Sequence, residues 1–308
     1  MNEPQACPNC LRRGWLLAHL APYIERALSG TSGLLVTELL GLSNADLATA
    51  VAPQVAEQVL TQASIVPESR LRADLVAGEC WACCRHDERY PAGLRAAPGA
   101  PPALIGRGDP VRLCRLEPRV SVAVVGSRRA SAYGREMARE LGRDLAREGV
   151  VVVSGLAFGI DACAHRGALE AGSTVAVLGC GPDIAYPASH RALWRQVTER
   201  GLVLSELPPG TGAWRWTFPA RNRIVAALCG MTVVVEAARR SGSLITANLA
   251  ADLGRELGAV PGPVSSRASA GTNDLLAGGA CVVRDASDVL EVLTGAPGAN
   301  GGASGQQG

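Results

Sequence analysis

The feature that most constrains the fold is a regular alternation, from residue 120 onward, of short Val-rich runs and amphipathic segments. The apolar runs cover residues 120–125, 150–154, 174–178, 202–205 and 232–235. Nearly continuous hydrophobic runs of this length are typical of parallel strands that are buried on both faces. Segments with helical spacing separate them. The chain is therefore predicted to be an α/β protein with a doubly wound, mostly parallel sheet.

The regions around this core predict two further parts. Leu16, Leu17, Leu20 and Ile24 repeat at helical spacing, so residues 1–78 are expected to form a small N-terminal helical module. The proline-rich stretch from 79 to 119 is expected to be irregular, apart from short strands, and to pack on the sheet. The other predicted segments are a helix over 51–63, short strands at 103–105, 111–113, 258–260 and 281–283, a main domain over 79–294 and a disordered tail over 295–308.

Composition limits the chemistry. The 308 residues carry 30 basic and 28 acidic side chains, and every basic residue is an arginine. A P-loop lysine and a Schiff-base lysine are therefore excluded, and any nucleic-acid site must be a local patch. The sequence shows no signal peptide and no apolar run long enough for a membrane span. We expect a cytoplasmic protein with no membrane partner.

Glycines follow the predicted strands at the edge where such sheets bind ligands. They let a ligand approach the backbone and leave the next helix free to offer N–H groups to an anion, although tight turns alone would also need them. These glycines are Gly126, Gly155, Gly159, Gly179, Gly181, Gly242 and Gly262. The glycine pattern of a dinucleotide site is not present, so no cofactor is expected. No matched nucleophile and base is recognisable either, so no catalytic residue is assigned.

Two arginine-containing loops are candidates for phosphate binding. Arg128 and Arg129 follow the first strand of the sheet and precede a predicted helix, where a helix dipole and two guanidinium groups would act together. A structural ion pair is the alternative. Ser241 and Ser243 can cap the helix after residue 235, and the same geometry would hold a phosphate within reach of Arg240.

A third stretch, 207–235, lacks acidic residues and interleaves arginines with aromatic side chains. This combination is typical of single-strand binding, in which phosphate contacts accompany base stacking. The alternative is that Trp216 and Phe218 are core and only the arginines are exposed. The residues concerned are Trp214, Arg215, Trp216, Phe218, Arg221 and Arg223.

Two other charged patterns favour structural explanations. Arg135, Arg139, Arg143 and Arg147 recur at i+4 spacing, but an acidic residue lies three positions before each of the last three. A salt-bridged solvent face explains this stripe better than a DNA track does. Asp161 and His165 share one helix face. They are better explained by an acidic residue at a helix start and a hydrogen-bonded histidine than by a metal or acid–base pair.

The cysteines include two CxxC pairs, Cys7 with Cys10 and Cys80 with Cys83. Four thiolates in two such pairs can hold zinc, but a gap of about 70 residues is unusual for a compact zinc module. We therefore assign no metal site. Cys84 and the remaining cysteines are interpreted as small buried hydrophobic residues.

The motifs together resemble those of the DNA-processing protein A (DprA, also called Smf) family. The resemblance covers roughly residues 84–290. The motifs come in one order: Gly126-Ser-Arg128, 154–161 with Ala164-His165, 176–181 with Tyr186-Pro187, 218–224, 241–246 and Val260-Pro-Gly262.

This resemblance implies an extended Rossmann-like domain that binds single-stranded DNA, in a recombination mediator without known catalytic activity. It implies a homodimer that protects incoming DNA and loads the RecA recombinase during natural transformation or DNA uptake. It also suggests a sterile-alpha-motif-like or helix-hairpin-helix-like N-terminal module. The DNA-binding set is Gly126, Ser127, Arg128, Arg129, Gly155, Arg221, Asn222, Arg223, Arg240, Ser241, Gly242 and Ser243. The alternative is a nucleotide-processing enzyme on a related fold, similar to phosphoribohydrolases, although their Pro-Gly-Gly-x-Gly-Thr-x-x-Glu loop is missing from 229–236.

Overall fold

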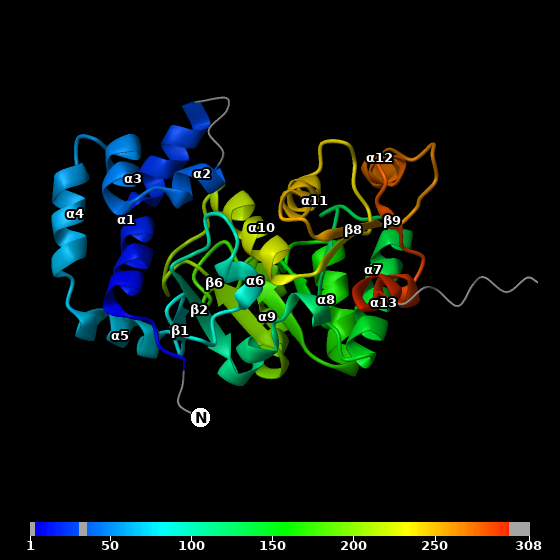
Figure 1. Ribbon diagram of the computed structural model, residues 1–308, viewed down its shortest axis with the longest axis horizontal. Coiled ribbons are helices and arrows are strands. Elements are labelled where there is room, and N and C mark those ends of the chain that lie inside the picture. Colours follow the sequence, from blue (N-terminus) through cyan, green and yellow to red (C-terminus); the bar gives the residue numbers. More distant parts are fainter. Residues whose placement is uncertain (1–3, 31–35, 296–308) are drawn as a thin grey trace, which may run out of the picture.

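A single nine-stranded sheet organises the computed structural model, which describes residues 4–30 and 36–295 (Figure 1). The strand order is β1-β2-β6-β5-β4-β3-β7-β8-β9. All neighbours from β6 to β9 pair in parallel, whereas β2 runs antiparallel to both β1 and β6. The expected α/β sheet, doubly wound and mostly parallel, is therefore confirmed.

The strands follow the Val-rich runs closely. Apart from the exposed Val120, the runs are largely buried because helices cover both faces of the sheet, as in other parallel sheets. The strand bounds are β1 Trp81–Cys84, β2 Ala103–Gly108, β3 Ser121–Val125, β4 Val151–Ser154, β5 Thr174–Val177, β6 Leu202–Ser205, β7 Met231–Val234, β8 Glu256–Ala259 and β9 Cys281–Val282.

Helices form two layers around the sheet. Helices α7, α8, α9 and α13 pack on one face, and α6, α10, α11 and α12 pack on the other. These helices are α6 Ala92–Arg95, α7 Ala132–Arg147, α8 Ile160–Ala171, α9 Arg191–Arg200, α10 Thr217–Leu228, α11 Ser243–Asp252, α12 Ala270–Ala277 and α13 Ala286–Thr294.

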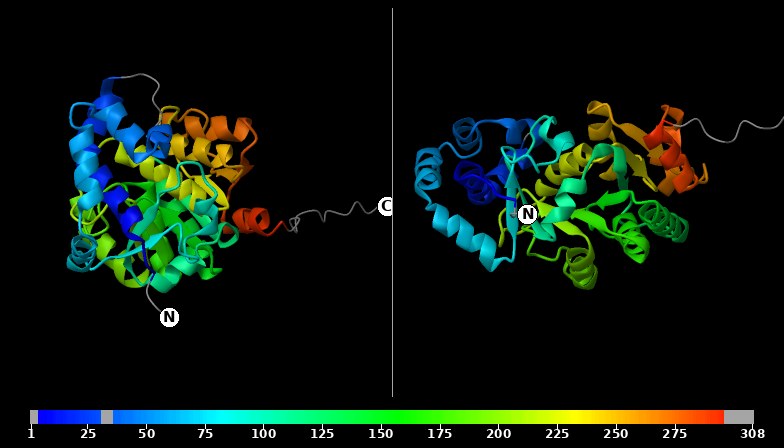
Figure 2. Two further views of the ribbon diagram at one scale, coloured as in Figure 1. Left: turned by 60° about the vertical axis from the view of Figure 1, so that its left-hand side comes forward. Right: turned by 60° about the horizontal axis from the view of Figure 1, so that its bottom comes forward.

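The N-terminal helices gather at one end of the molecule, and α12 and α13 lie at the opposite end. Figure 2 shows this arrangement from two further directions. The first four N-terminal helices share a hydrophobic core with Leu207 and Trp216 of the sheet region, and the fifth packs with β1 and β2 through Leu71 and Leu75, so all five are packed onto the sheet region. They are α1 Pro8–Gly30, α2 Val36–Gly41, α3 Asn44–Val51, α4 Ala56–Ile65 and α5 Glu68–Ala77.

Three local predictions were wrong. The segment 111–113 is not a strand but part of a 3-10 helix, Pro110–Arg115, because Asp109 caps it by accepting a hydrogen bond from Val111 N–H. Strand β1 was not predicted. The single helix expected over 51–63 is divided between α3 and α4, with Pro53 between them.

Two other expectations concern the tail and the membrane. The disordered tail predicted over 295–308 lies outside the described residues, apart from Gly295. None of the helices in the described part of the chain is both long and apolar enough to cross a membrane.

Candidate nucleic-acid interface

A cleft of about 770 Å³ opens at the carboxyl ends of β3, β4 and β7. Strand β3 lies between β4 and β7, where the order of the parallel strands reverses direction. This switch point is where open α/β sheets bind ligands. Ten of the twelve predicted residues line the cleft: Gly126, Ser127, Arg128, Arg129, Gly155, Arg221, Asn222, Ser241, Gly242 and Ser243.

An exposed arginine and two aromatic rings form one wall of the cleft. The guanidinium carbon of Arg128 lies 5.2 Å from the ring centroid of Phe218, within cation–π distance. The Phe218 ring is in turn 5.4 Å from that of Tyr186. Arg128 comes from the loop after β3, and Phe218 comes from the first turn of α10. The wall therefore offers a cation beside flat apolar surfaces.

The floor of the cleft holds a buried arginine. Arg221 donates hydrogen bonds to the carbonyl of Val177 at 2.6 Å and to Asn222 Oδ1 at 2.9 Å. A Cβ at residue 155 would lie 1.6 Å from the Arg221 guanidinium, so a larger residue here would displace that group. Burial lowers the pKa of Arg221, and the carboxylate of Asp161 opposes that effect.

Asp161 is the acidic partner beneath this floor. It accepts hydrogen bonds from the N–H groups of Gly155 at 3.1 Å and Ala157 at 3.4 Å, and its carboxylate is 3.9 Å from the Arg221 guanidinium. Burial raises the pKa of Asp161, while Arg221 and the two N–H groups act in the opposite direction. Asp161 lies in the first turn of α8, which agrees with its interpretation as an acidic residue at a helix start. His165 bonds to Thr174 on β5.

The start of α7 differs from the prediction. Residues Arg128 and Arg129 were expected to share an anion with the helix N–H groups, but a carboxylate of the chain already occupies this helix start. The buried Glu236 accepts a hydrogen bond from Ser131 N–H at 3.0 Å and another from the Ser131 hydroxyl. The Ser131 hydroxyl also accepts from Gly134 N–H and caps the helix. A ligand in the cleft would therefore meet the Arg128 side chain rather than this helix terminus.

Two predicted residues do not line the cleft. Arg223 is 4% exposed and forms an ion pair with Glu206 at 2.6 Å. It lies two residues after Arg221 on α10 and points to a different side of that helix, where it borders a neighbouring groove. Arg240 is exposed just before Ser241 but is not a lining residue. Assigning Arg223 to an accessible phosphate site was wrong, because its charge is already neutralised inside the protein.

The serine loop after β7 completes the cleft. The hydroxyls of Ser241 and Ser243 lie 2.8 Å apart. Ser243 N–H is 3.4 Å from Ser241 Oγ, so the expected capping contact is long, and Gly242 occupies the cap position itself. The rim therefore offers the half-buried Ser241 and the exposed Gly242, whereas Ser243 is buried and its hydroxyl bonds to that of Ser241.

The alternative interpretation of the third stretch placed both Trp216 and Phe218 in the core, and it holds for only one of them. Trp216 is 3% exposed and packs among the N-terminal helices, so it is core. Phe218 borders the cleft instead, as does Arg215. Tyr186 was missed as a site residue, although the Tyr-Pro pair that contains it had been noted. Its 44% exposure for an aromatic side chain is the signal that the structure adds.

The arginine stripe on α7 is largely ion-paired, as expected, but with different partners. Arg147 contacts Asp144 at 3.0 Å, as the spacing predicts. Arg143 also contacts Asp144, whereas Arg139 reaches Glu170 on α8 at 2.6 Å.

Fold and cleft together define a class: a doubly wound α/β protein with an arginine- and aromatic-lined site at its switch point. Comparison with known families then identifies the group. The chain belongs to the DNA recombination-mediator protein A family, whose model matches residues 81–294. The resemblance inferred from the sequence motifs is thereby confirmed.

Individual relatives agree with this assignment. Over 204 residues the chain is 50% identical to a putative DNA processing protein DprA of Mycobacterium tuberculosis, covering 66% of this chain and 52% of the relative. It is 42% identical over 205 residues to DNA processing protein DprA of Streptococcus pneumoniae, covering 66% and 71%. The chain thus matches only about half the length of the Mycobacterium relative.

Solved structures extend the similarity. The X-ray structure of Streptococcus pneumoniae DprA superposes with a TM-score of 0.73 and 32% identity, covering 93% of this chain and 98% of that one. DNA processing protein A of Helicobacter pylori superposes with a TM-score of 0.61 and 30% identity, covering 67% and 93%. The Streptococcus comparison therefore includes most of the N-terminal helical region as well as the sheet.

Proposed function

We propose that the cleft binds single-stranded DNA. The observation that carries the proposal is the exposed Arg128 guanidinium over Phe218, with Tyr186 beside it. A cation next to aromatic rings offers one strand both a phosphate contact and a stacking surface. The Helicobacter pylori relative, whose structure describes a single-stranded DNA binding mode, supports the same ligand.

The architecture of the cleft supports a strand rather than a duplex. Arg128 and Arg129 reach phosphates on one side, and the half-buried Ser241 hydroxyl donates from the other. Unpaired bases are free to stack on Phe218 and Tyr186, whereas the bases of a duplex are already stacked. The buried Arg221 holds the floor in place, so its role is to position the surrounding loops.

As a wider role, we propose a recombination mediator. In this function the protein, as a homodimer in the cytoplasm, protects incoming single strands and loads the RecA recombinase during DNA uptake. Membership of the recombination-mediator family supports this role. It requires binding and release of a strand but no bond cleavage, so we propose no enzymatic activity. The nucleotide-hydrolase alternative gains no support, because the Asp161 carboxylate in the cleft is already bound by backbone N–H groups and Arg221.

The test is a salt titration of binding to labelled oligonucleotides of equal length, one single-stranded and one duplex. We expect tighter binding to the single strand, little sequence preference, and an affinity that falls steeply with salt as counterions are released. Equal or tighter binding to the duplex would contradict the proposal.

RecA loading is tested separately, by RecA filament assembly on single strands already covered by another single-strand-binding protein. Assembly that this chain does not accelerate would contradict the mediator role alone.

A further inference from the structure

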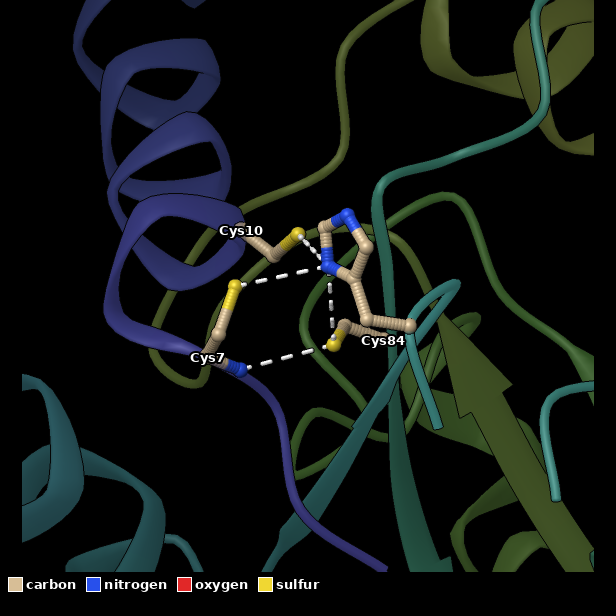
Figure 3. Close-up of side chains that lie close together, drawn as sticks. Cys7, Cys10 and Cys84 are labelled. Carbon is tan, nitrogen blue, oxygen red and sulfur yellow. Dashed lines mark hydrogen bonds between the residues drawn. The ribbon is translucent and has the colours of Figure 1, made fainter. Parts of the chain in front are cut away.

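Four metal-binding side chains meet where the N-terminal helices join the sheet. Cys7 immediately precedes α1, and Cys10 lies in its first turn. Cys84 is the last residue of β1, and His86 follows it in the turn. Figure 3 shows the three cysteine side chains pointing toward one another from the helix and the strand. Their sulfur atoms and one ring nitrogen of His86 all lie within 4.8 Å of one another.

The spacing of these atoms matches that of a tetrahedral metal site. Cys7 Sγ, Cys10 Sγ and Cys84 Sγ each lie 3.6 Å from His86 Nδ1. Around one Zn²⁺, bonds of about 2.3 Å to sulfur and about 2.0–2.1 Å to nitrogen give a sulfur–nitrogen separation of about 3.6 Å at the tetrahedral angle. Three equal distances to one nitrogen are what a shared central ion requires.

Hydrogen bonding and oxidation explain the cluster less well. The Nδ1 atom of a neutral imidazole has one lone pair, so it can accept from one of the three thiols and leaves two unexplained. A Cys7–Cys10 disulfide would need a sulfur–sulfur bond of about 2.0 Å, and it would give no role to Cys84 or His86. All three cysteines are free in the structure.

One backbone donor also contacts the cluster. The N–H group of Cys7 lies 3.4 Å from Cys84 Sγ. Such a donor stabilises the negative charge that develops when a cysteine loses its proton to a metal.

We propose that Cys7, Cys10, Cys84 and His86 bind one Zn²⁺ ion. Three sulfur ligands and one nitrogen fill the tetrahedral shell and leave no position for water, so the site is structural. The ion would join residues 77 positions apart and fasten the start of α1 to β1, the strand at the edge of the sheet. The proposal goes beyond DNA binding and does not depend on it.

The ligand set differs from the two CxxC pairs considered from the sequence. Only Cys7 and Cys10 belong to it, because successive residues of a strand point to opposite faces. Cys83 is completely buried in the main core on the other side of β1, where burial raises its pKa to about 12. Cys80 precedes the strand and donates to the Gly78 carbonyl. These two residues are therefore matched controls on the same segment.

The first experiment measures the metal content of the purified full chain. We expect about one zinc per chain by mass spectrometry, retained through dialysis against a weak chelator. The Cys10→Ser and Cys84→Ser variants should lose it, and Cys80→Ser should retain it. A wild-type chain that carries no zinc and binds none when Zn²⁺ is added would overturn the proposal, as would a Cys7–Cys10 disulfide in the freshly purified protein.

A second measurement does not depend on the variants folding. Wild-type chain stripped of metal and titrated with Co²⁺ should develop the visible d–d absorption of tetrahedral cobalt together with sulfur-to-cobalt charge transfer, saturating at one equivalent. Zn²⁺ should then bleach both bands. A pale octahedral spectrum would contradict the site. The Cys7→Ser/Cys10→Ser double variant should have a lower Tm than the wild type. Because the cluster lies outside the DNA cleft, the variant should keep its affinity for single strands at temperatures where it is folded.

Discussion

The arginines near the cleft divide into two kinds according to what their guanidinium groups contact. Arg221 and Arg223 are buried and bonded within the protein, to the Val177 carbonyl and to Glu206. Arg128 is exposed, lies over Phe218, and has no carboxylate partner among the residues that the structure describes. A phosphate can therefore bind Arg128 without displacing an existing partner, whereas at Arg221 or Arg223 it would have to break contacts within the protein.

Removing the Arg128 side chain should therefore weaken DNA binding directly. We expect Arg128→Ala to cost about 1.5–3 kcal/mol of binding free energy, the range of a hydrogen bond to a charged group. Fluorescence anisotropy with a labelled single strand at fixed salt measures this loss.

Arg143 on α7 is the matched control for Arg128. It is a surface arginine already paired with Asp144, so Arg143→Ala should leave the affinity for the single strand almost unchanged. An equal loss in both variants would mean that DNA follows the arginine stripe of α7, and the cleft assignment would fail.

For single residues, the sequence indicated which residues belong near the cleft better than it indicated where their side chains point. Gly126 and Arg128 could be predicted because they follow a strand end, whereas for Phe218 burial in the core remained an open alternative. Arg221 and Arg223 could not be separated, since two residues along a helix turn the side chain by about 200°. Only packing decides that one forms the floor of the cleft and the other meets Glu206.

Among the elements, α7 and α8 are in unusually close contact. A Cβ at Gly142 would lie 2.3 Å from the Ala164 carbonyl oxygen, and one at Gly167 would lie 1.9 Å from that of Arg139. Glycine at both positions lets the helix backbones approach. The close packing holds the helices that follow β3 and β4, and so the loops that form the cleft.

A buried histidine connects α8 to the sheet. His165 Nδ1 is 2.8 Å from Thr174 Oγ1, which itself donates to the Val152 carbonyl at 2.6 Å. Because the threonine hydrogen is used there, His165 must donate through Nδ1. Complete burial, and to a lesser degree the positive charge of Arg221, lower the pKa of His165 from 6.5 to about 3.

The lowered pKa of His165 predicts an acid-sensitive fold. Between pH 6.5 and 3 the unfolded chain binds a proton at His165 that the folded chain does not. The contribution of neutral His165 to the free energy of unfolding is therefore complete above pH 6.5 and is lost as the pH falls toward 3. His165→Asn can keep the donor but cannot titrate. The stability advantage of wild type over this variant should shrink by about 1.4 kcal/mol per pH unit below pH 6, measured by urea unfolding. A pH-independent difference would contradict a neutral His165.

The elements that were predicted correctly are those with a clear hydrophobic pattern in the sequence. Strands β3 to β7 could be predicted because each is a short Val- or Leu-rich run bounded by helical spacing. Strand β1, with the sequence Trp-Ala-Cys-Cys, was missed because it is short and its pairing with β2 is set by tertiary contacts. At 111–113 the apolar residues suggested a strand, but the Asp109–Pro110 turn determined the local structure.

For the whole molecule, long-range partners limit what sequence can predict. The CxxC motif at Cys7 was recognisable, yet its partners depend on α1 packing against β1 and on which face of that strand each cysteine occupies. The N-terminal helices show the same dependence. The spacing of Leu16, Leu20 and Ile24 predicted a helix, but their core partner Trp216 lies nearly 200 residues away in the sequence.

The shared core predicts that the N-terminal helices and the sheet unfold together. Trp216 donates its indole N–H to the Ala21 carbonyl at 3.2 Å and packs among the helices around α1. The slowest-exchanging amides of α1 and β3 should therefore have opening free energies within about 1 kcal/mol of each other in native-state hydrogen exchange. Trp216→Ala should lower both by about 3–5 kcal/mol, the usual cost of emptying a large aromatic site. If α1 lost protection while β3 kept its own, the helical module would be an independent unit and the contact at Trp216 would not couple the two regions.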